Sequence, residues 1–379
     1  MQPAHVMDFT QGASVLAVSL ELSSKNWKLA LDDGRRSRPR IWEKVSDDKP
    51  LQRLEQVIGV IEGTKRKWEL PAEMPVTVVY EAGQDGFWIQ RALESRGYPT
   101  VVVDPASLEV SRQARRAKTD RLDAEMLVRA LLAWLRGDRK SMRVVRIPSV
   151  QEEGLRQGVR ERGLLQKEIA QHRDRMRKLL RPVGVWEEVS EQRLQAGAVT
   201  DVEGHPLPAA LQQRLANEAE RVRMASEQLA KLEKTLCEQL PQQTRERVEQ
   251  LKRLKGIGWV AAVRLVLELF WRKFGNRREV GSCVGLVPQP YNSGDMVSDQ
   301  GISKSGNRRV RALLIELAWL WLRYQPQSEL AVWFNSRTAG DSKRGRRVAI
   351  VAVARRLVIL LWRFLETGAL PPGVQLKAA

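Results

Sequence analysis

Cysteine and histidine are scarce in this sequence of 379 residues, which contains two cysteines and three histidines. The cysteines, Cys237 and Cys283, are too few for a disulfide framework or a cysteine zinc site. With so few thiol and imidazole ligands, any metal site would be built from carboxylates, which favours magnesium or manganese. We therefore expect a reducing, cytoplasmic environment and no zinc chemistry.

Long hydrophobic runs are also missing. No apolar run reaches the length needed to span a bilayer, and the first residues lack the regions of a signal peptide, so we expect no membrane insertion. Acidic residues are outnumbered, with 64 Lys and Arg against 45 Asp and Glu, which gives a net charge of +19. A polyanionic partner is therefore expected, nucleic acid before an anionic membrane surface. The length predicts two or three domains.

The first third of the chain reads as an α/β domain. Apolar alternation predicts two strands within residues 14–31, with a turn near residues 23–26, and further strands at 40–45, 76–80 and 100–103. Helices are expected over residues 50–68, after residue 87, and from about residue 119. This strand and helix order resembles an RNase H-like (RuvC-like) fold, a mixed sheet flanked by helices.

Four acidic residues fall at informative places in this domain. Glu21 is on the first strand, Glu81 ends the fourth, and Asp120 and Asp123 share one face of the following helix. Carboxylates that converge at one end of a sheet can hold a divalent cation and support phosphoryl transfer. Taken singly, each acid has an ordinary structural explanation. Asp104 precedes a proline and reads as a helix N-cap, so it is left out of the set.

Basic residues surround these acids. Those nearest to the predicted metal site are Arg115, Arg116, Lys118 and Arg121. Such a run is often only a solvated face, but beside a carboxylate cluster it would suit a phosphate backbone.

The middle of the chain, from about residue 150, is rich in Glu, Gln, Arg and Leu. One helix is expected over residues 151–181, ended by Pro182-Val-Gly184, and a second after a loop over residues 197–208. The second helix carries a heptad-like apolar seam with one polar position, Glu218. Two such helices would form a coiled-coil hairpin, a dimerisation arm, or both.

The last third contains two candidate nucleic-acid motifs. Gly256-Ile-Gly258 can form a helix-hairpin-helix turn whose amides approach a phosphate, or a plain linker between helices. Residues 285–311 hold two prolines and several glycines, so we expect an irregular loop that presents Ser293. The cations that follow are Lys304, Arg308, Arg309 and Arg311. A serine backed by cations suits attack on a phosphodiester, although a surface loop with a helix N-cap is the ordinary alternative.

Short segments along nearly the whole chain together resemble one family. They are Tyr80-Glu81-Ala-Gly83, Lys118-Thr-Asp120-Arg-Leu-Asp123-Ala, Leu254-Lys-Gly256-Ile-Gly258, Val284-Gly285-Leu-Val-Pro288, Tyr291-Asn-Ser293-Gly294 and Gly301-Ile-Ser-Lys304-Ser-Gly306-Asn307-Arg308-Arg309. They resemble the DEDD-type insertion-sequence transposases, which are serine-containing recombinases related to Piv-type DNA invertases. Members of that family are guided by a bridge RNA.

The resemblance implies a RuvC-like domain over residues 1–149, a coiled-coil spacer over 150–245 and a mainly α-helical domain over 246–379. It implies that Glu81, Asp120 and Asp123 bind magnesium or manganese and that Ser293 is the nucleophile. The fourth position is Glu21, where the family usually has aspartate.

By the same resemblance, the chain is a bacterial DNA transposase that forms a phosphoserine link to DNA. Its expected partners are donor and target DNA, a structured guide RNA, and further copies of itself in a dimer or tetramer that completes the site. Two alternatives stay open from the residues. One is a metal-dependent nuclease that uses water, and the other is a nucleic-acid-binding protein whose site has decayed at Glu21.

Overall fold

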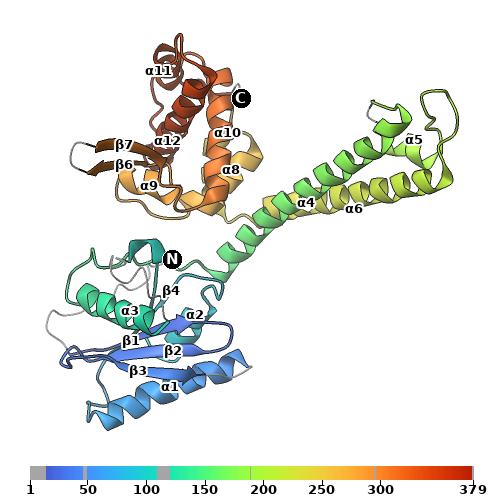
Figure 1. Ribbon diagram of the computed structural model, residues 1–379. Helices are drawn as coiled ribbons and strands as arrows, with labels where there is room; N and C mark the ends of the chain where they lie inside the picture. Colours follow the sequence, from blue (N-terminus) through green and yellow to red (C-terminus); the bar gives the residue numbers. More distant parts are fainter. Residues whose placement is uncertain (1–13, 46–48, 109–119, 188, 294–295, 378–379) are drawn as a thin grey trace. The chain divides into compact units, whose positions relative to one another are not determined.

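The computed structural model describes residues 14–45, 49–108, 120–187, 189–293 and 296–377 (Figure 1). The chain divides into two compact units, Met1–Pro148 and Ser149–Ala379, and each has hydrophobic cores of its own. The first unit is a mixed five-stranded sheet with helices, and the second is mainly helical.

The sheet of the N-terminal unit has the strand order β3-β2-β1-β4-β5. Its strands are β1 (Leu16–Leu22), β2 (Trp27–Asp32), β3 (Arg40–Val45), β4 (Val76–Glu81) and β5 (Thr100–Val103). β1, β2 and β3 are antiparallel neighbours, whereas β1, β4 and β5 are parallel. The strands predicted within residues 14–31 and at 40–45, 76–80 and 100–103 are confirmed, and their order is consistent with an RNase H-like arrangement.

Helices cover both faces of this sheet. They are α1 (Pro50–Lys67), α2 (Trp88–Glu94) and α3 (Asp120–Leu135). Alternate residues of β1 divide between the faces: Val18 and Leu20 pack with α1 and α2, and Ala17 packs with α3. Because both faces are covered, the central strands are apolar almost throughout. Whether a strand residue packs against α3 or against α1 and α2 therefore depends on its place in this alternation.

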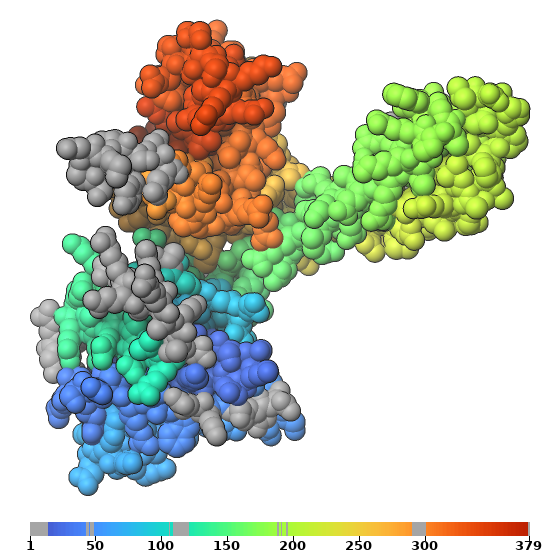
Figure 2. Space-filling view, viewed as in Figure 1, coloured from blue at the N-terminus to red at the C-terminus, as the bar shows by residue number. Residues whose placement is uncertain are grey.

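The C-terminal unit begins with a long helical hairpin. The helices α4 (Val150–Leu180) and α6 (Ala209–Gln239) run antiparallel, as the pairs His172 with Glu218 and Arg162 with Glu233 together show. The 3-10 turn η3 (Arg181–Val183), the short helix α5 (Glu191–Gln195) and a loop close the hairpin at its far end (Figure 1), which is the green to yellow-green tip of the hairpin in Figure 2. Both long helices were predicted, whereas α5 was not.

The rest of this unit is a helical body around one core. Its elements are α7 (Gln242–Lys252), α8 (Trp259–Leu265), the π-helix η4 (Val266–Phe270), α9 (Arg277–Cys283), β6 (Pro288–Ser293), β7 (Met296–Ile302), α10 (Arg308–Tyr324), α11 (Glu329–Arg337) and α12 (Lys343–Thr367). The base of α4 joins this core through Leu155 and Val159. In the described part of the chain, no helix is both long and apolar enough to cross a membrane.

Candidate functional site

The acids Glu21 and Glu81 lie side by side in the sheet. β1 and β4 pair in parallel register, and the last pair is Leu20 with Tyr80, so the two glutamates stand at the next level on adjacent strands. Leu20 and Tyr80 face the α1 and α2 side, and alternation therefore directs Glu21 and Glu81 to the face that α3 covers. Both carboxylates are partly buried.

The start of α3 lies on the same face, next to these strands. The Ser19 hydroxyl is buried and donates a hydrogen bond of 2.7 Å to the Ala124 carbonyl. Ser19 precedes Glu21 by two residues and points to the same face, so Asp123, next to Ala124, lies near the end of β1 that carries Glu21. The backbone of Asp120 begins α3, one helical turn before Asp123, and its side chain lies outside the described residues.

The donor set fits a hard divalent cation, because all four predicted ligands are carboxylates. Among the side chains that the structure describes, however, no three Asp, Glu, His or Cys residues are grouped closely enough to hold a metal ion. Glu21 and Glu81 each make further interactions. A complete site therefore requires the Asp120 carboxylate, or an approach of the described acids when a cation binds.

Of the basic residues predicted near these acids, Arg115, Arg116 and Lys118 lie outside the described residues. Arg121 is exposed on the first turn of α3 and pairs with Glu125, with Nε 3.2 Å from Oε1. An exposed pair of this kind is weak, so the Arg121 guanidinium can exchange Glu125 for a phosphate.

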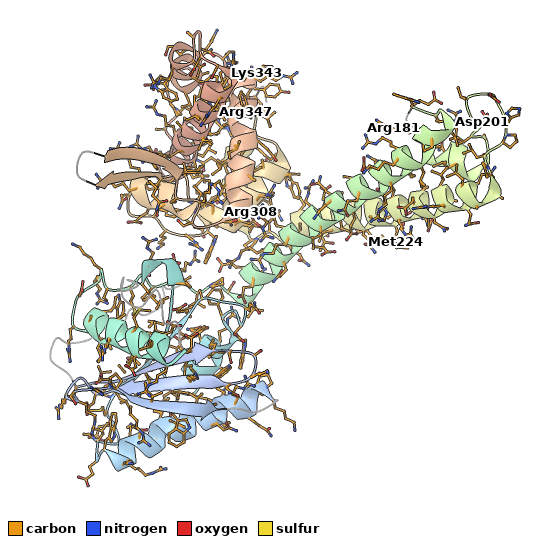
Figure 3. All side chains as sticks on the ribbon, viewed as in Figure 1. Arg181, Asp201, Met224, Arg308, Lys343 and Arg347 are labelled. Atoms are coloured by element: carbon orange, nitrogen blue, oxygen red, sulfur yellow. The ribbon has the colours of Figure 1, made fainter. Side chains whose placement is uncertain are left out.

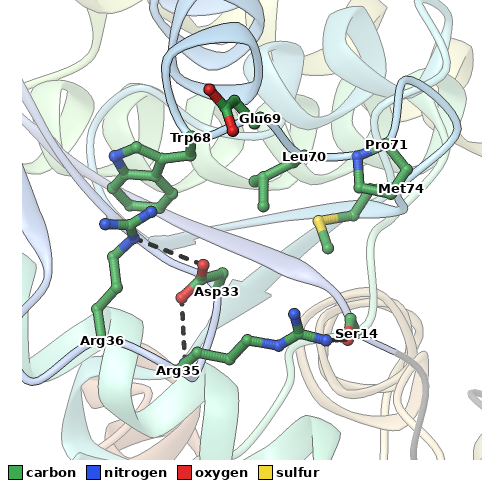
Figure 4. A pocket seen from close by; sticks show the side chains of 9 residues that line it. All are labelled: Ser14, Asp33, Arg35, Arg36, Trp68, Glu69, Leu70, Pro71 and Met74. Carbon is green, nitrogen blue, oxygen red and sulfur yellow. Dashed lines mark hydrogen bonds and ion pairs between the residues drawn. The ribbon is translucent and has the colours of Figure 1, made fainter.

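A separate pocket lies at the opposite end of the sheet from Glu21 and Glu81. Its lining includes Asp33 after β2 and Trp68 after α1 (Figure 4). Arg36 stacks over the Trp68 ring at 3.8 Å, and its Nε lies 3.5 Å from Asp33 Oδ2. Because Arg36 is already paired and stacked, and Arg35 donates a hydrogen bond to the Ser14 hydroxyl, we leave this pocket out of the candidate site.

Ser293 ends a strand rather than standing in an irregular loop, so the sequence-based expectation was wrong. β6 and β7 pair antiparallel in a hairpin, here called the serine hairpin, with Ser293 opposite Met296 at its tip. Its prolines, Pro288 and Pro290, are tolerated because both strands of a two-stranded sheet are edges, and the register shifts between them. The Ser293 side chain lies outside the described residues.

The base of the serine hairpin is held by close backbone contacts. A Cβ at Gly285 would stand 2.0 Å from the Ser305 carbonyl oxygen, and one at Gly306 would stand 2.2 Å from that of Cys283. Both glycines have positive φ, at 66° and 86°. Lys304 also adopts a positive φ of 56°, and its amide donates to the Gly285 carbonyl. Only glycine fits at 285 and 306, which explains their place in the motif.

The predicted cations after the hairpin divide by environment. Asn307 caps α10, and Arg308 in its first turn is exposed and makes no ion pair with a described carboxylate (Figure 3). Arg309 pairs with the buried Glu268, with Nε 3.6 Å from Oε1. Arg311 donates to the carbonyls of Val284 and Ser305 and so braces the hairpin base. Lys304 and Arg308 are therefore the cations best placed to meet a phosphate.

The Gly256-Ile-Gly258 turn joins α7 to α8. Gly256 has a φ of 89° and lies against the Leu320 backbone of α10, whereas Gly258 is exposed as the N-cap of α8. The C-terminal segment also holds this turn, because Lys377 Nζ donates to the Ile257 carbonyl. Only the Gly258 side of the turn is left open, and its contact with a phosphate stays a prediction.

Sequence reasoning missed Glu268, the buried partner of Arg309. It is an acid in the apolar run Val266-Leu-Glu-Leu-Phe270, and that unusual placement was the available signal. A second exposed cationic surface lies at the start of α12, where Lys343, Arg344, Arg346 and Arg347 are exposed, apart from Arg308 in Figure 3.

Two family models match this chain. One, described as the transposase IS116/IS110/IS902 family, matches residues 248–332, which include Gly256, Ser293 and Arg308. The other, a DEDD transposase model of the IS110 type, matches residues 45–184 and so includes Glu81, Asp120 and Asp123 but not Glu21. A DEDD domain implies the use of a divalent metal ion in general terms.

Curated relatives match along most of the chain. "Putative transposase y4rJ" of Sinorhizobium fredii is 36% identical over 383 residues, covering 95% of this chain and 94% of that protein. The transposase for insertion sequence element IS1328 of Yersinia enterocolitica is 25% identical, covering 76% and 83%. The transposase for insertion sequence element IS1111A of Coxiella burnetii is 25% identical, covering 76% and 77%. By these matches the chain belongs to the IS116/IS110/IS902 family of transposases, enzymes that act on DNA, with a DEDD domain toward its N-terminus and the family's second conserved region toward its C-terminus.

Proposed function

We propose that this transposase cleaves and rejoins DNA strands through a covalent link to Ser293. A magnesium or manganese ion held by Glu21, Glu81, Asp120 and Asp123 would assist. The observation that carries the proposal is the place of Ser293 at the tip of a hairpin that residues 303–307 connect to the cationic first turn of α10. The second conserved region of the family spans both features.

In the proposed reaction, the Ser293 hydroxyl oxygen attacks the phosphorus of one DNA phosphodiester. The bond from oxygen to phosphorus forms, the bond to the neighbouring deoxyribose oxygen breaks, and the departing oxygen takes up a proton while the serine loses one. The serine ester keeps the phosphodiester energy. A hydroxyl from another strand can therefore displace Ser293 and rejoin the DNA without ATP.

Lys304 and Arg308 are proposed to hold the phosphate oxygens. Both are exposed, and neither forms an ion pair with a carboxylate in the described part of the chain. Arg308 also stands at a helix N-terminus, where backbone amides favour an anion. Their positive charges would offset the negative charge that develops on these oxygens.

The four carboxylates are proposed to bind the cation because Glu21, Glu81 and Asp123 belong to one face of the sheet end. When bound, a divalent cation supplies Lewis-acid polarisation of the phosphate. Glu21 is one methylene longer than the usual aspartate. A glutamate can still bind magnesium through one oxygen, so we propose that it serves as a ligand.

We propose DNA as substrate, a structured guide RNA as partner, and a homodimer or homotetramer as the working form. The net charge of +19 and the exposed cations support nucleic acid, and the family resemblance supports the guide RNA and the assembly. We also propose three functional parts: the RuvC-like domain (1–149), a coiled-coil spacer (150–245) that contains the α4 and α6 hairpin, and the helical serine domain (246–379).

The test is to trap the covalent link. Full-length protein with magnesium, DNA from the ends of its own element and any RNA encoded there should give an adduct that resists denaturant. Mass spectrometry should place the adduct on Ser293. Ser293→Ala should abolish the adduct and spare DNA binding. Ser305→Ala removes an exposed hydroxyl from the same segment and should leave the adduct intact.

The outcomes separate the alternatives. A nuclease that uses water would cut DNA without an adduct, and a decayed binding protein would neither cut nor form one. Normal cleavage by Ser293→Ala would exclude the serine mechanism.

A further inference from the structure

Glu268 is an unusual residue in the core of the C-terminal unit. Its side chain is 4% exposed, and its neighbours in η4 are all apolar. Its Oε2 is buried and has no hydrogen-bond partner among the described residues. A carboxylate buried with one unsatisfied oxygen destabilises the fold, which indicates that it is retained for another purpose.

Glu268 stands where the helix widens into a π-helical turn. The segment Val266–Phe270 follows α8 without a break, and such turns are frequent at functional sites. From this stretch, Arg264 donates to the Arg309 carbonyl and Glu268 reaches the Arg309 guanidinium. Two residues of one helical stretch therefore hold the first turn of α10, which follows the serine hairpin after residues 303–307.

The contact between Glu268 and Arg309 is suited to orienting a side chain that must also bind something else. Nε of Arg309 lies 3.6 Å from Oε1, close enough for attraction but too far for a hydrogen bond. The Arg309 side chain is 49% exposed, so part of its fork of donors is open to solvent. A cation near a helix N-terminus is otherwise disfavoured by the helix dipole. Glu268 offsets that cost from the buried side.

We propose that Glu268 is a positioning residue that aims Arg309 at a DNA phosphate beside the one attacked by Ser293. This inference rests on the proposed function, because it assigns the phosphate contact to the same reaction. The buried carboxylate attracts the Nε side of the guanidinium and leaves its other donors for the two oxygens of a phosphate, a geometry that arginine matches and lysine does not.

The sign of the Glu268→Gln effect separates this proposal from simple charge. Removing a buried negative charge makes the site more positive, so a purely electrostatic contribution would strengthen DNA binding. A positioning contribution predicts weaker DNA binding instead. Cleavage should then fall about ten- to a hundredfold, the scale of a substrate held out of place. Glu268→Asp should recover part of that loss. Glu316→Gln, the same change at an exposed site on α10, should leave cleavage unchanged.

The decisive experiment is a double-mutant cycle on kcat/KM for DNA cleavage and on DNA affinity, with thermal unfolding as the folding control. Arg309→Gln should lower affinity and reduce the salt slope by about 1. In that background, Glu268→Gln should have no further effect. Equal effects of Glu268→Gln in both backgrounds, or tighter binding by the single variant, would overturn the proposal.

Arg309→Lys tests the same proposal if the Glu268→Gln variant does not fold, because this substitution leaves the buried carboxylate in place. It retains the charge but loses the fork, so cleavage should fall although the salt slope is preserved. Unchanged cleavage would count against the proposal. A missing serine adduct in wild-type protein would refute the proposed function instead, and the cycle on DNA affinity would still report on Glu268.

Discussion

Replacing Gly306 by alanine should damage the segment that links the serine hairpin to α10. Gly306 has a φ of 86°, which side chains with a Cβ rarely adopt, and its Cβ would stand 2.2 Å from the Cys283 carbonyl oxygen. The neighbouring Asn307 amide donates to the same oxygen. The added methyl group cannot avoid this contact without moving the backbone that carries the α10 cap.

Two costs add at Gly306. The left-handed backbone costs an alanine about 1–2 kcal/mol, and the lower entropy of the unfolded chain returns about 0.4–1 kcal/mol. Relief of the collision adds about 1–3 kcal/mol. A control at Gly368, the C-cap of α12, isolates the backbone cost from the collision. Gly368 has a φ of 69°, and no described atom would lie within 4 Å of its Cβ. Gly368→Ala should therefore cost only the backbone term less the unfolded-chain entropy, about 0–1.5 kcal/mol of unfolding free energy.

Thermal unfolding of the C-terminal unit gives the measurement. At about 2–4 °C per kcal/mol for a unit of this size, Gly306→Ala should unfold several degrees below Gly368→Ala. DNA cleavage should fall in Gly306→Ala and persist in Gly368→Ala, because only the first displaces the turn that holds Arg308. Equal unfolding temperatures for the two variants would refute the close approach at Gly306.

Three further predictions concern other parts of the molecule. Ser19→Ala, which removes the buried hydrogen bond to Ala124, should cost about 0.5–1.5 kcal/mol in denaturant unfolding and lower magnesium-dependent cleavage, because α3 loses its tie to β1. In the hairpin of α4 and α6, burial raises the pKa of Glu218. His172 and two arginines lower that pKa by more than burial raises it, so it lies below its usual range. The stability from this carboxylate is therefore complete above the unfolded pKa of about 4.3 and lost as pH falls through the lowered value, and Glu218→Gln should flatten the acid limb of the unfolding curve. DNA affinity should fall about 10³- to 10⁵-fold between 50 and 200 mM salt if six to ten phosphates are contacted, and a flat response would exclude electrostatic binding.

The sheet and the places of its acids follow from local patterns. Alternation along β1 fixes which side chains meet α3, and parallel pairing of β1 with β4 brings Glu21 and Glu81 to one level. Ser19 shows what sequence alone cannot supply: its hydroxyl meets Ala124, 105 residues away, and nothing local predicts that contact.

The serine segment is where local rules misled. Proline and glycine in residues 285–311 argue against a strand, yet an isolated hairpin has two free edges on which proline costs no ladder hydrogen bond. Arg311 and Glu268 depend on contacts across the fold, with the carbonyls of Val284 and Ser305 and with Arg309. The pattern of charge along the sequence does not distinguish the arginines that brace the serine hairpin from those that are open to a phosphate.

We propose that a carboxylate-bound metal ion enables Ser293 to form a covalent link with DNA. The most direct measurement is the yield of the Ser293–DNA adduct against magnesium concentration, in wild-type protein, Asp123→Asn and Asp104→Asn. Asp104 is an acid at the end of β5 that we place outside the site. We expect an adduct that requires the metal ion, disappears in Asp123→Asn and persists in Asp104→Asn. An adduct that forms equally well in chelator, or in Asp123→Asn, would contradict this proposal.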